Sequence, residues 1–366
     1  MPSTPYRCIA VRSATEQYDI HIGPGVLAHV GEHVVSLTPG RKVFLMSHPP
    51  LYKLYGATLV DSLRAAGCEV AACCLVPEGE RSKTLLSASR LFTRLARGGA
   101  DRHSVVCALG GGVLGDLAGF VAATYMRGLP LVQIPTSLLA MVDSSIGGKT
   151  AVNHKLGKNL IGAFYPPRAV FTDTALLQSL PEREYLCGLS EIVKAGVIGD
   201  VALFQFIEDH IKAIRQRAET VLTTLIERAI AVKVRVVQED PTERGVRAIL
   251  NFGHTLGHAL EAATMYAQYS HGEAVAVGMA LVAILSARLG YCSIAVRSRL
   301  CALIEGLGLP TTYADLPPQR LLEVMTHDKK SLNGVVRFVL LKNIGEVVFH
   351  QQVPLEALQT LLAEYA

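Results

Sequence analysis

Histidine and glutamate residues in the second half of the chain have a spacing that suits a metal-binding helix. His254 and His258 are four residues apart, and Glu261 follows three residues later. On a helix this places all three on one face, where two imidazoles can bind one divalent ion. His271 opens the next predicted helix, and Glu191 lies in an otherwise apolar stretch. Together these residues favour a divalent metal site over separate hydrogen-bonded histidines. The spacing selects His254 and His258 as the first pair of ligands and leaves open whether His258 is a ligand or a proton carrier.

A glycine-rich turn is the second chemically informative segment. Gly110, Gly112 and Gly115 fit the pattern GxGxxG between a predicted strand at 104–109 and a predicted helix at 117–125. Glycine lets the backbone approach a pyrophosphate, and the helix N-terminus presents unpaired N–H groups to it. Unlike the usual dinucleotide fingerprint, the turn follows the third predicted strand, and no acidic residue ends a strand about 20 residues later. The segment therefore predicts a variant dinucleotide site, with a tight turn that binds no ligand as the alternative.

Two further polar segments contain residues suited to ligand binding. The loop at 77–83 follows the second predicted strand, where open α/β sheets bind ligands, and its acidic residues suit ribose hydroxyls. The segment at 143–159 is rich in glycine and contains Lys149 and Lys158. We expect it to be an anion-binding loop rather than a core element, with an exposed loop of solvated lysines as the alternative.

Alternating strands and helices are predicted in the first half of the chain. Strands separated by helix-length segments indicate right-handed βαβ units and a parallel sheet, so we predict an α/β, Rossmann-like domain over residues 1–177. An additional hairpin is expected from the segments at 7–11 and 18–22. The strands are predicted at 42–46, 69–76, 104–109 and 131–135, with helices at 51–66 and 83–97.

The second half of the chain has a helical pattern. Apolar residues recur at spacings of three and four, which predicts a mainly α-helical domain over residues 178–366. Pro166, Pro167 and Pro181 mark the change between the two halves. The predicted helices span 182–198, 202–238, 248–263 and 272–289, and a small hairpin is predicted from 335–341 and 346–349.

The composition excludes several classes of protein. Of the 366 residues, 50% are hydrophobic and 18% are charged, which excludes a disordered or fibrous chain. The net charge of +4 is too small to hold long nucleic acid by charge alone, but it is compatible with a small anionic substrate. The eight cysteines are scattered, and we find no apolar run of membrane-spanning length and no signal-peptide core at the N-terminus. We therefore expect a soluble cytoplasmic protein without a disulfide framework.

Several segments, in order, closely resemble the 3-dehydroquinate synthase family of sugar-phosphate cyclases. They run from Glu78 to Lys330 and include LGGGVLGD, QIPTSLLAMVDSSIGGKTAVN, GKNLIGAFYPP, LSEIVKAG, RAILNFGHTLGHALE and SHGEAVAVGM. The resemblance implies a homodimer whose N-terminal domain binds NAD and whose helical domain binds metal and substrate. It also implies Zn²⁺, with Co²⁺ as a substitute, held by Glu191, His254 and His271. His258 then becomes a substrate-side residue rather than a metal ligand.

The resemblance also implies roles for individual residues. Arg127 corresponds to an arginine lent by the neighbouring subunit, and Glu243 and His258 correspond to positions with proton-transfer roles. Ser47 and His48 stand where relatives often carry Asp or Asn, which affects one contact to the adenosine ribose. The implied NAD contacts are Glu78, Gly79, Glu80, Lys83, Gly112, Val113, Leu114, Gly115, Asp116, Thr136, Ser137, Asp143, Lys149 and Lys158. The implied substrate contacts are Asp143, Lys149, Asn159, Lys194, Lys233, Arg247, Asn251, His258, His271 and Lys329.

The implied reaction is that of a carbon–oxygen lyase acting on phosphate. It converts 3-deoxy-D-arabino-heptulosonate 7-phosphate to 3-dehydroquinate and phosphate by NAD-mediated transient oxidation, phosphate elimination, reduction and intramolecular aldol closure. This is the second step of the shikimate pathway, which leads to chorismate and the aromatic amino acids. The alternatives are a related cyclase with a different substrate and a metal-dependent polyol dehydrogenase. Arg247 and Asn251, which precede His254, favour the dehydroquinate branch.

Overall fold

The structure is a computed structural model that describes residues 6–13, 17–314, 316–327 and 336–365. The chain divides into two compact units, Met1–Leu180 and Pro181–Ala366. The predicted boundary lies between residues 177 and 178, close to this division. The ligand-binding roles expected of the two domains stay predictions.

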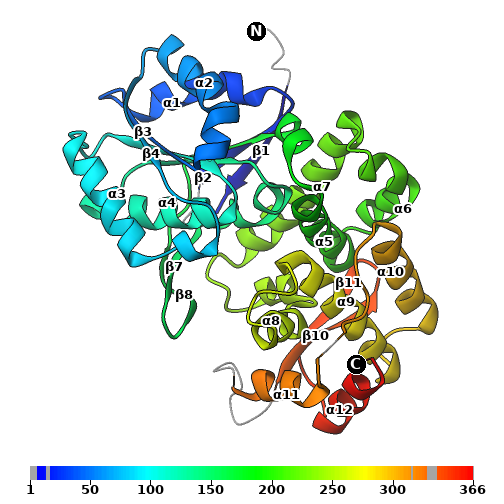
Figure 1. Ribbon diagram of the computed structural model, residues 1–366. Coiled ribbons are helices and arrows are strands. Elements are labelled where there is room, and N and C mark those ends of the chain that lie inside the picture. Colours follow the sequence, from blue (N-terminus) through cyan, green and yellow to red (C-terminus); the bar gives the residue numbers. More distant parts are fainter. Residues whose placement is uncertain (1–5, 14–16, 315, 328–335, 366) are drawn as a thin grey trace. The chain divides into compact units, whose positions relative to one another are not determined.

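The N-terminal unit is built on a seven-stranded sheet in the order β1-β2-β9-β6-β5-β3-β4. All neighbouring strands are parallel except β1 and β2, which form the predicted antiparallel hairpin. Figure 1 shows the sheet between α1 and α2 on one face and α3 and α4 on the other. The strands are β1 (Arg7–Arg12), β2 (Gln17–Gly23), β3 (Lys42–Ser47), β4 (Glu69–Leu75), β5 (Val105–Gly110), β6 (Leu131–Pro135) and β9 (Ala169–Asp173). The helices are α1 (Val30–Leu37), α2 (Pro49–Ala65), α3 (Leu85–Arg97) and α4 (Gly112–Thr124).

Continuous apolar strands explain why this sheet was predictable. Every residue of β5 and β6 is buried, as expected where helices cover both faces of a parallel sheet. One core cluster joins Phe44 and Met46 of β3 to Val106 of β5 and to Leu117 and Val121 of α4. The four predicted strands, the two predicted helices and the N-terminal hairpin are all confirmed.

The prediction that the segment at 143–159 lies outside the core was wrong. Two strands in this segment, β7 (Lys149–His154) and β8 (Gly157–Phe164), form an antiparallel hairpin. The hairpin is visible in Figure 1 below α4. The side chain of Val152 is fully buried in the core cluster, and Thr150 lies so close to α4 that a Cβ on Gly119 would be 2.4 Å from Thr150 Cγ2. The buried residues Thr150 to Val152 lie between the polar Lys149 and Asn153, so the segment contains only a short apolar run and was not predicted as a strand.

The C-terminal unit is mainly helical and is built around α9 (His271–Arg288). This helix packs against α5, α8, α10, α12 and β10 (Figure 1). Its length and composition would allow a membrane span, but 78% of it is buried inside the unit, so it is a core helix. The other helices are α5 (Glu182–Gly199), α6 (Val201–Arg215), α7 (Glu219–Glu239), α8 (His254–Ala263), α10 (Ile294–Gly306), α11 (Pro318–His327) and α12 (Leu355–Glu364). The predicted hairpin is confirmed as β10 (Arg337–Asn343) and β11 (Glu346–Gln352).

Two of the predicted helices are interrupted. The segment at 202–238 breaks between α6 and α7, where Arg217 adopts a φ of 56°. The segment at 248–263 is a 3-10 helix, η6 (Val246–Asn251), followed by Gly253 with a φ of 78° and then by α8. Apolar periodicity continues across both breaks, so it could not locate them.

Glycine contacts between α8 and α9 should be essential to the stability of the C-terminal unit. A Cβ on Gly278 would lie 2.0 Å from the carbonyl oxygen of Gly253. We expect Gly278→Ala to force the two helices apart and to lower the free energy of unfolding by about 3 kcal/mol or more, as severe overpacking does. Gly306→Ala is the control, because a Cβ there meets only the tip of Ile211 at 3.1 Å. Equal urea midpoints for the two variants would contradict this account of the α8–α9 contact.

Candidate functional site

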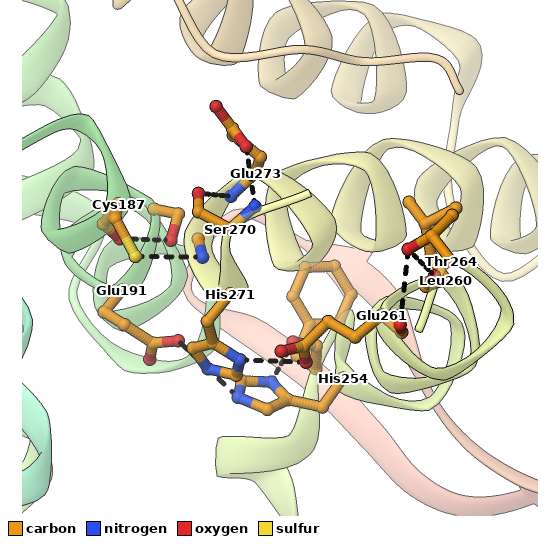
Figure 2. Close-up of polar contacts among 12 residues, drawn as sticks. Cys187, Glu191, His254, Leu260, Glu261, Thr264, Ser270, His271 and Glu273 are labelled. Atoms are coloured by element: carbon orange, nitrogen blue, oxygen red, sulfur yellow. Dashed lines mark hydrogen bonds and ion pairs between the residues drawn. The ribbon is translucent and has the colours of Figure 1, made fainter. Parts of the chain in front are cut away.

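Three side chains from three helices of the C-terminal unit form a candidate metal centre. Glu191 lies in α5, whereas His254 and His271 are the first residues of α8 and α9. Glu191 Oε1 is 3.5 Å from His254 Nε2 and 3.7 Å from His271 Nε2. Figure 2 shows the carboxylate pointing toward both imidazole rings. One ligand atom from each residue lies within 4.8 Å of the others, a spacing that one divalent ion can bridge.

The charge of Glu191 is balanced by nearby cationic and polar groups. Its side chain is 2% exposed, with Lys194 at Oε2 and the two imidazoles facing Oε1. Burial disfavours the charged form, but Lys194, which contacts Oε2, and the two imidazoles outweigh it and hold the pKa of Glu191 well below its usual range. A buried, ionised carboxylate is costly unless cations lie against it. One carboxylate oxygen and two imidazole nitrogens within reach of one another are also a donor set that suits a divalent cation.

The two histidines of the centre differ in protonation. Burial and the charge of Lys194 lower the pKa of His254 well below its usual range, so this imidazole is neutral at pH 7. Burial also opposes protonation of His271, but the carboxylates of Glu191 and Glu261 outweigh it and raise the pKa of His271 to about 10. Metal binding at this centre would therefore release a proton from His271.

His258 does not join His254 at the centre. The two rings have centroids 5.2 Å apart, but the side chain of His258 is exposed and groups instead with Glu261 and His271. The pair selected by spacing, His254 and His258, thus differs from the pair that lies against Glu191, which is His254 and His271. Spacing along one helix could not identify Glu191 or His271, because both come from other helices.

Close backbone packing between α5 and α9 sets the position of His271. Gly272 N donates to Cys187 Sγ at 3.0 Å, and a Cβ on Gly272 would lie 2.2 Å from the carbonyl oxygen of Cys187. Cys187 precedes Glu191 by one helical turn. This contact therefore brings the residue after His271 directly against the helix that carries Glu191. Cys187 and Gly272 were not among the predicted site residues.

The other predicted substrate residues of this unit lie on α5, α7 and the segment before α8. Lys194 and Lys233 are buried on α5 and α7. Arg247 in η6 is 1% exposed, and its Nη1 donates to the carbonyl oxygen of Pro241 at 2.7 Å. Asn251 Nδ2 lies 3.5 Å from Glu243 Oε1, and Glu243 has a φ of 59°. Lys329 lies outside the described residues.

A partly buried network in the N-terminal unit links three predicted ligand-binding segments. Lys83 Nζ donates to Asp116 Oδ2 at 2.5 Å and to Asn159 Oδ1 at 2.6 Å. Asn153 Nδ2 donates to Glu80 Oε1 at 2.7 Å. Burial raises the pKa of Asp116, with Lys83 acting against it. The loop at 78–83, the glycine turn and the β7–β8 hairpin are thus held together. Asn153 was not among the predicted site residues, and its place in the network depends on the hairpin that sequence analysis missed.

The glycine turn begins a helix without a side-chain cap. Gly111 is the N-cap of α4, and no side chain caps the helix there, so the first turn can present N–H groups to a phosphate. A Cβ on Gly112 would lie 2.8 Å from Ser144 Oγ, and one on Gly115 would lie 2.9 Å from Gln133 Oε1. Val113, Leu114 and Asp116 belong to the beginning of this helix, which starts five residues before its predicted position.

The remaining predicted residues of the N-terminal unit lie near strand ends or on the hairpin. Thr136 and Ser137 follow β6, and Asp143 lies in the short helical segment Ala140–Ser144. Lys149 begins β7, and Lys158 and Asn159 lie in β8, where Asn159 has a φ of 56°. Glu78 and Gly79 lie in the loop after β4, and Arg127 ends the 3-10 helix η3 (Tyr125–Arg127).

Ser47 and His48, which depart from the family pattern, have contacts of their own. Ser47 Oγ donates to the carbonyl oxygen of Leu109 at 2.9 Å, and His48 Nδ1 lies 2.8 Å from the carbonyl oxygen of Val76. Both side chains are buried. These contacts connect the carboxyl ends of β3, β4 and β5, so the two polar side chains help to hold neighbouring strands together.

Two family models match the chain. The 3-dehydroquinate synthase N-terminal model matches residues 73–187, and the 3-dehydroquinate synthase C-terminal model matches residues 188–331. Curated 3-dehydroquinate synthases from Pelotomaculum thermopropionicum and Acidithiobacillus ferrooxidans are 47% and 46% identical to it, over 93% and 98% of the chain and 92% and 98% of their own lengths. The chain belongs to the 3-dehydroquinate synthase family. Its activity is that of the family, the lyase reaction EC 4.2.3.4 of the shikimate pathway, which confirms the predicted reaction.

Solved structures of sugar-phosphate cyclases confirm the predicted fold class. A 2-deoxy-scyllo-inosose synthase in complex with carbaglucose-6-phosphate, NAD⁺ and Co²⁺ has a TM-score of 0.88 and 28% identity, over 99% of this chain and 100% of that one. A 2-epi-5-epi-valiolone synthase from Streptomyces hygroscopicus, with NAD⁺ and Zn²⁺ bound, has a TM-score of 0.86 and 28% identity, over 98% and 100%. A probable glycerol dehydrogenase from Sinorhizobium meliloti, at 17% identity and a TM-score of 0.64, shares the fold alone, over 97% and 98%.

The buried pair of Lys83 and Asp116 should contribute to stability in this synthase. Lys83→Met leaves Asp116 without its cation, and we expect the free energy of unfolding to fall by up to about 3 kcal/mol, at the low end for buried pairs. The low end applies because 19% of the Asp116 side chain is exposed. Asp116→Asn in the Lys83→Met background should recover part of the loss, since it removes the unpaired charge. Urea unfolding of the single and double variants checks this. A double variant less stable than Lys83→Met would contradict the view that the unpaired charge of Asp116 causes the loss.

Proposed function

We propose that the enzyme carries out its reaction with NAD bound at the glycine turn and with Zn²⁺, replaceable by Co²⁺, held by Glu191, His254 and His271. The observation that carries this proposal is the buried carboxylate of Glu191, whose Oε1 lies within 3.7 Å of one nitrogen of each imidazole. Three protein ligands of this kind leave coordination positions open for substrate oxygens, as catalytic Zn²⁺ sites do.

The two cofactors supply chemistry that the side chains lack. Zn²⁺ held by Glu191, His254 and His271 would supply Lewis-acid activation of the substrate hydroxyl. NAD at the glycine turn would supply reversible hydride transfer, and it would not be consumed because the hydride returns to the substrate. The support for both cofactors is the donor set at Glu191 and the uncapped glycine turn at the start of α4.

Cationic side chains bind and orient the dianionic substrate in this proposal. Lys149, Lys194, Lys233 and Arg247 neutralise the phosphate and carboxylate through charge-assisted hydrogen bonds. Lys194, Lys233 and Arg247 are buried, so each such bond is stronger than one made by a solvated lysine. Asn159, Asn251 and Lys329 add further hydrogen bonds to the substrate. Asp143, Lys149 and Lys158 contribute to the NAD site together with the loop at 78–83.

His258 and Glu243 move protons in this proposal. The side chain of His258 is exposed and lies one helical turn from His254, which suits a proton carrier close to the metal centre. Glu243 lies beside Asn251. The phosphate of the substrate can itself act as the base for elimination, so no further protein base is required.

We also propose a cytoplasmic homodimer in which Arg127 is lent to the partner's site. The exposed side chain of Arg127 and the left-handed backbone of Met126 and Arg127 are compatible with this role. The only partners required are the sugar phosphate and the second subunit, with neither nucleic acid nor membrane involved.

Cofactor turnover separates the proposed reaction from that of a polyol dehydrogenase. We expect phosphate release from 3-deoxy-D-arabino-heptulosonate 7-phosphate to run to completion with NAD⁺ far below the substrate concentration. Absorbance should reveal no net NADH, because the hydride returns within each cycle. Phosphate assay and absorbance on the same sample check this. NADH formed in step with substrate consumption would instead support the dehydrogenase. Turnover of a phosphorylated hexose in place of the heptulosonate would support a related cyclase.

Alanine variants distinguish metal ligands from the proton carrier. Glu191→Ala, His254→Ala and His271→Ala should each lose bound Zn²⁺ and activity together. His258→Ala should keep its Zn²⁺ and lose rate, by roughly 10² to 10⁴ in kcat if it acts in general acid–base catalysis. Metal analysis of the purified proteins and kcat measurements check this. Loss of Zn²⁺ from His258→Ala equal to that from His254→Ala would restore the pair that the helical spacing selected.

A further inference from the structure

The imidazole of His271 lies between two carboxylates. Its Nδ1 is 3.1 Å from Glu261 Oε2, and its Nε2 is 3.7 Å from Glu191 Oε1. Figure 2 shows Glu261 on the side of the ring opposite Glu191. The side chain of Glu261 is 9% exposed, so its charge is largely shielded from water. The ring therefore has one nitrogen directed at the candidate metal centre and the other at a buried acceptor.

We propose that Glu261 is a positioning residue that holds His271 in the tautomer able to bind the metal. An ionised carboxylate only accepts hydrogen bonds. Glu261 lies within hydrogen-bond distance of Nδ1 at 3.1 Å, whereas Glu191 is 3.7 Å from Nε2, so the neutral imidazole keeps its proton on Nδ1. The lone pair is then on Nε2, the nitrogen that faces Glu191. A carboxylate that fixes a histidine in this way also raises the basicity of the ligating nitrogen. This inference rests on the proposal that Glu191, His254 and His271 hold the metal.

The imidazole of His254 has the same orientation, with Nδ1 at an acceptor and Nε2 toward Glu191. His254 Nδ1 lies 3.2 Å from the carbonyl oxygen of Phe252, which can only accept a hydrogen bond. Its Nε2 faces Glu191 Oε1 at 3.5 Å. Both rings thus direct Nε2 toward one carboxylate oxygen, and both have an acceptor at Nδ1. Because α8 carries His254 and Glu261, this helix supplies one ligand and the group that orients the other.

A competing interpretation makes Glu261 a ligand. His258, Glu261 and His271 also have ligand atoms within 4.8 Å of one another and could hold a second cation. His271 would then have to give up the Nδ1 proton that Glu261 accepts. The two interpretations predict different metal stoichiometries, so titration distinguishes them.

The test measures Zn²⁺ affinity and the tautomer of His271 in the full-length protein. Apo-enzyme is titrated with Zn²⁺ in competition with a chromogenic chelator, for the wild type, Glu261→Gln and Glu261→Ala. Two-bond ¹H–¹⁵N correlation spectra of the zinc-loaded protein report which ring nitrogen of His271 carries the proton. Glu273→Gln is the matched control, since Glu273 is also a carboxylate near the start of α9 but binds Ser270 and Arg183 rather than His271. Circular dichroism confirms that each variant is folded.

We expect the wild type to bind one Zn²⁺ with the His271 proton on Nδ1. Zn²⁺ affinity should fall about tenfold in Glu261→Gln, which keeps an acceptor oxygen, and up to about 100-fold in Glu261→Ala. The stoichiometry should stay at one, and Glu273→Gln should match the wild type.

Three outcomes would overturn the inference: unchanged Zn²⁺ affinity in both Glu261 variants, an equal loss in Glu273→Gln, or a second Zn²⁺ that disappears in Glu261→Gln. If Glu261→Ala fails to fold, Glu261→Gln alone decides the question. Undiminished Zn²⁺ binding in His254→Ala would instead refute the proposed ligand set, so the two failures are distinguishable.

Discussion

The buried charge of Glu191 is the constraint on which the C-terminal unit depends. A carboxylate removed from water must be matched by cations or by hydrogen-bond donors, and here the match comes from Lys194 and from His271, whose pKa is raised to about 10. With His254, the side chains of the centre come from three helices, so the helices must approach closely enough for the side chains to meet. Glycines at the contacts of α9 with α5 and α8 permit this approach. The charge interactions at the centre therefore depend on the close packing of the helices.

The N-terminal unit also contains a largely buried carboxylate, Asp116, which is paired with a lysine. Lys83 lies between Asp116 and Asn159 and so connects a loop, a helix start and a hairpin that are distant in the sequence. Its single charge neutralises Asp116 and also fixes the hairpin that bears Lys149 and Lys158. Lys83, which is expected to contact NAD, therefore also has a structural role. For this reason its substitution would affect stability and binding together.

Sequence patterns predicted elements well where one physical signal dominated. The strands β3 to β6 are continuous apolar runs, and helices such as α2 and α5 have a regular apolar periodicity, so both could be predicted without tertiary information. β7 was missed because Lys149 and Asn153 flank the inward-facing Thr150 and Val152 and make the segment look like a loop. The metal ligands could not be selected by spacing alone, because two of the three come from other helices. Resemblance to a family supplied that set, and the geometry around Glu191 supports it.

The glycines differ in whether a second mutation could make room for a side chain at their position. At Gly278 and Gly272 the space that a side chain would need is filled by main-chain carbonyl groups of other helices. Every amino acid has a carbonyl group, so no second mutation can make room at these positions. At Gly112 and Gly115 the nearest atoms belong to the side chains of Ser144 and Gln133, which a smaller residue could replace. A mutagenesis library screened for folding can therefore recover paired changes around the glycine turn, whereas the contacts around α9 offer no compensating partner.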